Sequence, residues 1–289
     1  MSNTIELAKS FVPKLDECYR LASLTSVLDG APELAKQGAN ANELIIPMMS
    51  MDGLADYSRN GGYVQGGVTM TNETVKCNFD RGRRFDVDVM DDLETAGLAF
   101  GRLSAQFIRD KVVPELDAFR FASYCGISGV TKKEETLADG AATVAALSAA
   151  VTAMDDEEVT ATGRYLFNTP PLLQGINDMD TTKSKKVLEG FEQVIKVPQR
   201  RFYTAIKQLS GKTGEEAGGY TKAAGAANIN FAIVQKDALI QYTKHAAPKI
   251  IAPENNPDAD AYVFGYRMVG IAKAYKNMLS GMYFSHDKA

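Results

Sequence analysis

The sequence predicts an α+β fold in which a compact body carries an N-terminal arm and a projecting hairpin. The spacing of apolar residues changes at Asp91-Asp92: residues 68–89 alternate, whereas residues 92–125 place an apolar residue every three or four positions. The first spacing is typical of strands and the second of one long helix. Residues 52–67 are polar and rich in glycine, so they bury little of themselves. We therefore expect a long helix in the body and a hairpin that needs a partner surface.

The composition is that of a soluble folded protein without a strong charge bias. The chain has 289 residues, of which 45% are hydrophobic and 24% charged, and its net charge is −4. A protein that wraps nucleic acid would be strongly basic, so no general affinity for DNA is expected. Cys18, Cys77 and Cys125 form no CxxC pair, which argues against a disulfide framework or a structural zinc site. With no signal peptide and no long apolar run, we expect cytoplasmic synthesis and no membrane contact.

The N-terminal arm is predicted from two segments. Residues 4–28 repeat apolar residues at helical spacing, and Pro13 marks a bend or a starting point within them. Residues 29–42 are rich in Gly, Ala and Asn and form a linker. The first 42 residues are therefore expected to lie outside the compact core.

The projecting hairpin is predicted from strands on either side of a turn. Residues 43–51 form a strand whose Pro47 requires an edge or a bulge. Asn60-Gly61 is a strong turn signal. Alternation then runs through residues 68–79 and resumes at 85–89, and we expect all of it to belong to one long hairpin.

The long helix and the remaining elements follow in order. Pro114 falls inside the predicted helix 92–125, so we expect a kink or a restart there, and Gly126 ends the helix. The rest of the chain is predicted to contain helices at 137–154, 183–191 and 200–209, a flexible loop at 211–227, a short helical or extended piece at 237–245, and strands at 162–168, 229–234, 261–271 and 279–286.

Motifs that suggest catalysis or cofactor binding are incomplete. Gly211-Lys212-Thr213 resembles the end of a phosphate-binding loop, but Ile206 stands where that motif needs glycine. Ser285-His286-Asp287 holds the residue types of a serine triad, yet adjacent residues do not converge in the required geometry. The four consecutive acids at 155–158 lack the spacing of a calcium loop, and His245 has no second ligand nearby. We expect no catalytic, cofactor-binding or metal-binding residue.

A basic cluster is formed by Arg81, Arg83 and Arg84, which alternate with Asp80, Asp86 and Asp88. Such a cluster is able to contact nucleic acid. The alternation of sign favours ion pairs, either within one subunit or between subunits.

Residues 44–125 resemble the major capsid proteins of tailed bacteriophages, with the Hong Kong 97-type capsid fold. The motifs that carry the resemblance are DGLADY at 52–57, RNGGY at 59–63, DRGRRFDVD at 80–88 and VVPELDAFR at 112–120. They occur in the family's order: strand, glycine-rich hairpin, basic strand and long helix. The run that begins at Tyr262 is compatible with the family, and residues 128–235 match it mainly by size and position.

The resemblance implies a division of the chain into parts with distinct roles. It implies an N-terminal arm (1–42), an extended loop hairpin (43–85), a peripheral domain with the spine helix (86–127), an axial domain (128–235) and a return to the peripheral domain (236–289). The residues expected at subunit interfaces are Tyr57, Arg59, Asn60, Tyr63, Arg81, Arg83 and Arg84.

The resemblance also implies the partners. Subunits would form hexamers and pentamers of an icosahedral shell around double-stranded DNA, located in the virion and assembled in the host cytoplasm. A separate scaffolding protein is implied because nothing of that kind precedes the arm, and a portal protein and an optional decoration protein complete the set. Residues 56–67 contain no lysine, so the covalent cross-link of some relatives is not expected.

Three alternatives remain at this point. An encapsulin-like compartment would share the architecture but enclose protein instead of DNA. An enzyme would need a convergent polar pocket, for example around Arg164 and Asp178. A minor decoration or tail protein would be present in few copies.

Overall fold

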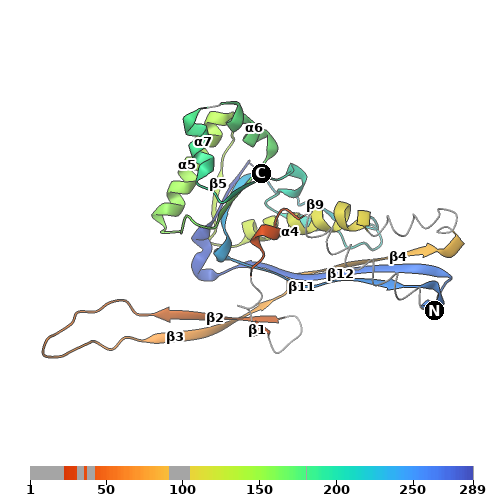
Figure 1. Cartoon of the computed structure of the whole chain (residues 1–289), viewed down its shortest axis with the longest axis horizontal. Coiled ribbons are helices and arrows are strands. Elements are labelled where there is room, and N and C mark those ends of the chain that lie inside the picture. The colour runs from red at the N-terminus through yellow and green to blue at the C-terminus, as the bar shows by residue number, and fades with distance from the viewer. Residues whose placement is uncertain (1–22, 31–35, 38–42, 91–104, 180, 289) are drawn as a thin grey trace.

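A computed structural model describes residues 23–30, 36–37, 43–90, 105–179 and 181–288 of the chain. Figure 1 shows a body built on one sheet, a long flat sheet beneath it, and a hairpin that projects away from both. The predicted α+β class is confirmed. The predicted helix 4–28 lies mostly outside the described residues; its last part forms a turn and the short 3₁₀ helix η1 (Ser26–Leu28).

The body contains a five-stranded sheet in the order β5-β13-β10-β6-β7. Its central strands β6 and β10 are buried along their whole length, which explains the continuous apolar or aromatic runs at 165–167 and 231–234 within them. β10 is antiparallel to β6 and β13, while β5 and β7 run parallel to their neighbours. The five strands are β5 (Thr131–Glu134), β6 (Arg164–Asn168), β7 (Gln193–Lys196), β10 (Ile229–Gln235) and β13 (Met282–His286).

Helices cover both faces of this sheet. Phe231 and Ile233 of β10 point to one face, where α5 contributes Val144 and Leu147. The alternate residues of β10 point to the other face and share a cluster with Phe121 of α4. The helices on the first face are α5 (Gly140–Asp156), α6 (Pro170–Asp178) and α7 (Thr182–Glu189), and α4 (Val113–Gly126) covers the second.

The second sheet is long and has the order β11-β12-β4. β12 (Ala261–Ala274) lies between β11 (Leu239–Ile251) and β4 (Phe79–Asp88), with both neighbours antiparallel to it. A bulge interrupts β11 between Thr243 and His245. The helical stretch before and within α4 packs on this sheet through a cluster that includes Ile108, Leu116 and Phe264. α4 is therefore shared by both sheets.

The projecting hairpin consists of β2 (Glu43–Met51) and β3 (Val68–Lys76), paired from Glu43↔Lys76 to Met51↔Val68. The strand at 43–51 is confirmed. Pro47 lies beyond the two residues of β2 that pair with β1 (Lys36–Gln37), so β2 has an open edge at this position, as expected. At the tip, Ser58 pairs with Gly62, and the glycine with positive φ is Gly62 (+73°).

The prediction that the residues after position 79 belong to this hairpin is wrong. β4 pairs with β12 along its whole length, from Phe79↔Gly270 to Asp88↔Ala261, and makes no ladder with β3. Alternation alone identified the strand but not its partner, because apolar and polar residues alternate in either pairing. Residues 77–78 are thus the point where the chain leaves the hairpin and enters the body.

The long helix contains a wide turn at the place where a kink was expected. Residues 108–112 form the π-helical turn η3 (Ile108–Val112), and the Val113 N–H bonds to the Ile108 carbonyl five residues earlier. Pro114 follows directly and lacks an N–H, so the wide turn accommodates the missing hydrogen bond and moves the ring away from the preceding turn. The helix ends at Gly126 as predicted, and its first part, residues 91–104, lies outside the described residues.

The segment 199–222 differs from prediction. The helix expected at 200–209 is wrong: the chain forms the 3₁₀ turn η4 (Gln199–Arg201) and the strand β8 (Ile206–Gln208). β8 pairs with β9 (Tyr220–Lys222), which lies inside the stretch predicted as a loop. Short 3₁₀ turns also occur at η5 (Lys236–Ala238), η6 (Pro253–Asn255) and η7 (Lys276–Gly281). The piece expected at 237–245 is extended for most of its length, as the first part of β11.

Helices α5 and α6 approach each other through two glycines. A Cβ added at Gly140 would lie 2.2 Å from the carbonyl oxygen of Gly175, whereas a Cβ at Gly175 would meet only ordinary contacts at 3.5 Å. We expect Gly140→Ala to destabilise the chain by about 1–3 kcal/mol because backbone must move. Gly175→Ala, the matched control, should change stability by less than about 1 kcal/mol. Urea unfolding of both variants measures the difference, and equal losses would contradict this packing.

Candidate assembly interface

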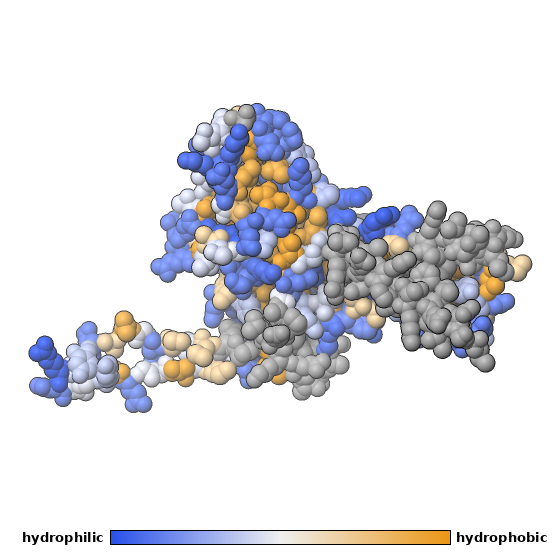
Figure 2. Space-filling model, viewed as in Figure 1, coloured by the Kyte–Doolittle hydropathy of each residue, from blue (hydrophilic) through white to orange (hydrophobic). Residues whose placement is uncertain are grey.

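The projecting hairpin exposes a stripe of large apolar side chains. In its register Met49 pairs with Met70 and Met51 with Val68, and cross-strand partners share a face of the ladder. The exposed fraction of the side chain is 55% for Met49, 66% for Met51, 69% for Val68 and 65% for Met70. Figure 2 shows hydrophobic residues along the hairpin, away from the body. We call Met49, Met51, Val68 and Met70 the hairpin stripe.

On the opposite face, Ser50 pairs with Thr69 near the tip, and Thr71 lies one step further along that face. Beyond the strands, Leu54 is fully exposed, and the rings of Tyr57 and Tyr63 contact each other at a tilt of 59°, with centroids 4.9 Å apart. A hairpin with four exposed apolar side chains on one face leaves a surface that is suited to another protein.

The root of the hairpin, in contrast, is fixed to the body. Val75 is buried against Ile240 and Ile271 of the long sheet. Asn78 donates to the Ala272 carbonyl at 2.9 Å and accepts from the Ala272 N–H at 3.0 Å, which replaces two ladder bonds where the chain turns. The hairpin is therefore held at one end and projects at the other.

A buried carboxylate fixes the segment that follows the arm. Asp117 of α4 is fully buried and accepts hydrogen bonds from the Ser23 hydroxyl at 2.9 Å and the Thr25 hydroxyl at 2.7 Å, and from two backbone N–H groups of the same segment. Arg201 forms an ion pair with it at 3.2 Å. One α4 residue thus joins the N-terminal segment and the η4 turn.

A second α4 residue completes this anchor. Arg120, 2% exposed, donates to the Thr25 hydroxyl at 2.8 Å and pairs with Asp29 at 3.2 Å. Gln241 of β11 donates to the Thr25 carbonyl and to Asp29, and accepts from the Tyr124 hydroxyl, whose pKa is raised by burial. Residues 23–29 are consequently tied to both α4 and the long sheet.

The basic cluster of β4 is engaged within the chain. Arg81 pairs with the partly buried Glu115 of α4 at 2.8 Å and donates to the carbonyls of Leu209 and Gly219. Arg84 pairs with Asp86 at 2.8 Å on the surface. The sequence prediction of ion pairs is therefore confirmed within one subunit, and a role between subunits stays a prediction.

Arg83 organises the glycine-rich loop between β8 and β9. Its guanidinium donates to the Glu216 carbonyl at 2.9 Å. A Cβ at Gly218 would lie 2.9 Å from its Nη1, and one at Gly211 3.2 Å, and both glycines have positive φ (+62° and +71°). Only glycine lets the loop close around the arginine in this way. The loop predicted to be flexible is thus shaped by the basic cluster, and a strand precedes Gly211 where a helix was expected.

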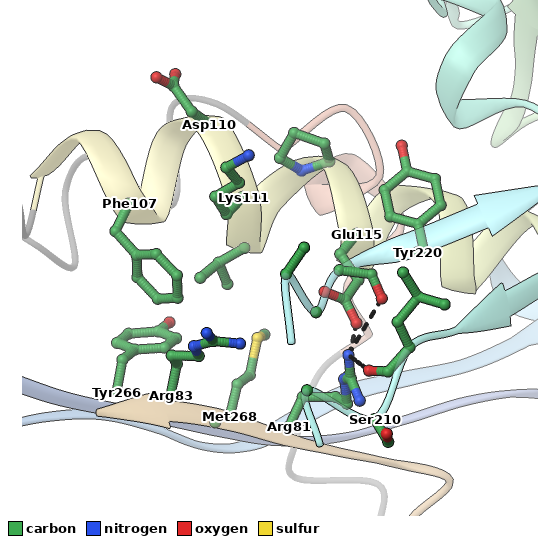
Figure 3. A pocket seen from close by; sticks show the side chains of 18 of the residues that line it. Arg81, Arg83, Phe107, Asp110, Lys111, Glu115, Ser210, Tyr220, Tyr266 and Met268 are labelled. Carbon is green, nitrogen blue, oxygen red and sulfur yellow. Dashed lines mark hydrogen bonds and ion pairs between the residues drawn. The ribbon is translucent and has the colours of Figure 1, made fainter. Parts of the chain in front are cut away.

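A cleft of about 1060 Å³ lies between α4, β4 and this loop. Figure 3 shows Arg83 on the strand and Lys111 on the helix across from it, with Phe107 and Tyr266 facing each other at one end. The Arg81–Glu115 pair bridges the two walls at the other end. The other basic residues of the lining are Arg84, Arg200 and Lys222.

The structure brings together only part of the predicted interface set. Tyr57, Arg59, Asn60 and Tyr63 all lie exposed at the hairpin tip. The three arginines lie on β4, in the other sheet, where two of them line the loop. Sequence reasoning missed the hairpin stripe, although Met49, Met51, Val68 and Met70 show the alternation that would have identified it.

The described residues contain no arrangement that suggests catalysis. The Ser285 hydroxyl donates to Glu135 at 2.7 Å instead of facing His286, Arg164 bonds to Asp155, and Asp178 accepts from Gln174. Among these residues there is no group of three or more potential metal ligands. Burial raises the pKa of the Cys125 thiol to about 11, so it is protonated at neutral pH. None of the described helices combines the length and apolarity needed to cross a membrane.

Comparison with known proteins identifies the fold. The solved structures that resemble the chain include the capsid of the cyanophage P-SCSP1u, with a TM-score of 0.55 at 12% identity over 87% of this chain and 85% of that one. The chain has the fold of phage capsid proteins. A Gordonia phage Cozz structure gives 0.60 at 10% identity, covering 93% and 87% of the two chains. The virus-like particle from Pyrococcus furiosus gives 0.60 at 9% identity, covering 96% and 98%. No protein-family model and no curated protein sequence matches.

The Asp117 anchor can be tested by a single substitution. Asp117→Asn removes the charge that faces Arg201 in a buried site, so we expect a loss of about 3 kcal/mol in the free energy of unfolding. Asp110→Asn, which alters an exposed pair with Arg109, should leave stability nearly unchanged. Urea unfolding measures both, and the variant at 117 should also become more sensitive to proteolysis between residues 23 and 30. An unchanged midpoint for Asp117→Asn would show that the anchor is dispensable.

The role of Arg83 predicts local loosening of the loop. Arg83→Met should speed tryptic cleavage after Lys212 by about fivefold or more, because the charge-assisted bond to the Glu216 carbonyl is lost. Arg84→Met serves as the control, since Arg84 pairs with Asp86 and not with the loop. Similar cleavage rates for the two variants would argue against the loop closing around Arg83.

Proposed function

We propose that this chain is a major capsid protein that assembles with copies of itself into the shell of a tailed bacteriophage. The observation that carries the proposal is the hairpin stripe. Four large apolar side chains lie exposed on one face of an element that is fixed at its root to the described part of the body. In water such a face costs free energy, and a second subunit that covers it removes the cost. The capsid fold supports the same reading.

The proposed roles of the parts follow the division expected from the resemblance. Residues 1–42 act as the arm, 43–85 as the extended loop, 86–127 and 236–289 as the peripheral domain, and 128–235 as the axial domain that meets its copies at fivefold and sixfold axes. In the fold, β4 of the extended-loop segment lies in the long sheet, and β13 of the last segment lies in the five-stranded sheet. The functional boundaries are therefore expected to cross these two sheets.

We also propose the composition of the shell and the proteins that assemble with it. The shell consists of hexamers and pentamers that enclose double-stranded DNA without reading its sequence, in keeping with the net charge of −4. A separate scaffolding protein guides assembly, a portal protein occupies one vertex, and a decoration protein is an optional addition. Assembly takes place in the host cytoplasm, and the mature protein resides in the virion. The role is structural and not enzymatic.

Deletion of residues 57–66 tests the proposal directly. We expect a folded chain that no longer forms complete shells of normal size and strength, since the tip that reaches a neighbour is removed. Electron microscopy of the expressed protein with its scaffold, compared with the full chain, provides the measurement. Shells of normal size and resistance from the deletion variant would refute the bridging role of the hairpin.

A finer test alters only the hairpin stripe. The variant carries Thr at positions 49, 51, 68 and 70. Each replacement removes about 1.5 kcal/mol or more of the free energy gained when a neighbouring subunit covers that side chain. The concentration needed for assembly should then rise by more than about a hundredfold. The control replaces the polar face, with Ser50→Thr, Thr69→Ser and Thr71→Ser, and should assemble normally. Sedimentation velocity over a concentration series measures both; coincident assembly curves would exclude the stripe from the contact.

A second candidate function has a specific observation in its favour. The virus-like particle from Pyrococcus furiosus matches nearly the whole of this chain. The chain would then form a shell that encloses protein instead of DNA. Analysis of purified particles decides between the two, because nuclease-protected DNA supports the phage shell and a protein cargo without DNA supports the compartment.

A further inference from the structure

The cleft between α4, β4 and the glycine-rich loop holds positive charge that the described part of the chain does not neutralise. Arg81 and Arg84 have carboxylate partners. Four other basic residues of the lining have none among the described residues: Arg83, Lys111, Arg200 and Lys222. Lys222 donates to the amide oxygen of Asn228 and lies 5.5 Å from the ring centroid of Tyr203, which leaves its charge uncompensated.

The acidic residues that line the cleft do not balance this charge. Glu115 already forms an ion pair with Arg81. Asp110 pairs with Arg109 outside the cleft and points away from it in Figure 3. Cations that share a hollow surface with aromatic walls raise the local potential and favour a ligand with several carboxylates. The uncharged hairpin stripe does not fit this requirement.

The same chain carries a matching surface at the end of α5. Asp155, Asp156, Glu157 and Glu158 are all exposed, and within the described part of the chain only Asp155 has a basic partner, Arg164. The placement of these four carboxylates at the end of α5 is unfavourable in an isolated chain. The last turn of α5 contains no basic residue, so the carboxylates repel one another at the negative end of the helix dipole. Glu158 also has a positive φ of 56°, which a side chain other than Gly, Asn or Asp rarely adopts.

One chain cannot bring these two surfaces together. α5 packs on one face of the five-stranded sheet and α4 on the opposite face, so the acidic end of α5 and the cleft are separated by the sheet. Figure 1 shows the two regions on different sides of the body. A contact between them therefore requires a second copy.

We propose that the cleft receives the acidic end of α5, residues 155–158, from a neighbouring copy of this chain. The contact joins two different surfaces, so it repeats head to tail and closes into a ring when the rotation between copies allows it. This inference rests on the proposed self-assembly and specifies one contact within it. The apolar hairpin stripe supplies affinity, and the charged contact supplies direction, because a reversed neighbour would place like charges together.

Charge exchange tests the contact. The variant with Glu157→Lys and Glu158→Lys should need at least a tenfold higher concentration to assemble than the unaltered chain. The variant with Arg200→Glu and Lys222→Glu should show the same loss. A variant with all four substitutions should recover assembly, because the attraction is restored with its signs exchanged. Glu134→Lys with Glu189→Lys changes exposed acids that belong to neither surface and should assemble normally. Thermal unfolding checks that every variant is folded. Normal assembly by either double variant, or no recovery in the fourfold variant, overturns the contact.

A chemical measurement separates this inference from the proposed function. Isotope-labelled and unlabelled copies are mixed and treated with a carbodiimide, which joins a carboxylate to a lysine amine with loss of water. Mass spectrometry should find residues 156–158 of one copy joined to Lys111 or Lys222 of another, in small oligomers as well as in shells. Shells without such links overturn the contact and leave the proposed function intact. Absence of any oligomer overturns both. A third outcome would assign the cleft to DNA: no cross-links form, the unaltered chain binds a double-stranded DNA probe, and the variant with Arg200→Glu and Lys222→Glu does not bind it.

Discussion

The carboxylate of Asp117 joins three parts of the chain that the two sheets alone leave separate. It lies on α4, which packs on both sheets, and it binds the segment at 23–25 and the η4 turn. A buried charge is tolerated only when its hydrogen bonds are satisfied, and here hydroxyls, backbone N–H groups and an arginine meet that need. The position of the segment that follows the arm and the position of the β8–β9 hairpin therefore depend on the same group.

A second constraint comes from the crossing of β4 into the long sheet. Because β4 pairs with β12 and not with β3, the projecting hairpin has only two long strands and a short third one. Two strands bury little on their own, so the stripe stays exposed while the root is held by Val75 and Asn78. The exposed surface and the fixed root have one cause, the change of partner at residues 77–78.

The sequence predicts elements better than it predicts their partners. The strands predicted at 43–51, 162–168 and 229–234 are found because their apolar runs are short and bounded by turn residues. The helix expected at 200–209 fails because Arg200, Phe202 and Ile206 have mixed spacing, and the structure places them on a turn and a strand. The tip residues of the predicted interface lie together, but the cleft does not follow from the sequence, since β4, α4 and β9 meet only in the folded chain. Long-range contacts of this kind leave no local signature.

The choice of side chains on the hairpin has a consequence for the accuracy that assembly demands. Three of the four members of the stripe are methionines, whose unbranched thioether chains adopt many shapes at similar energy. A surface built from them buries apolar area against neighbours of slightly different contour, whereas a branched or aromatic surface would fit only one. The icosahedral shell that we propose would place chemically identical subunits in positions that are not equivalent. Tolerance of misfit at the contact, and not shape complementarity, would then be the property that lets one polypeptide occupy all of them.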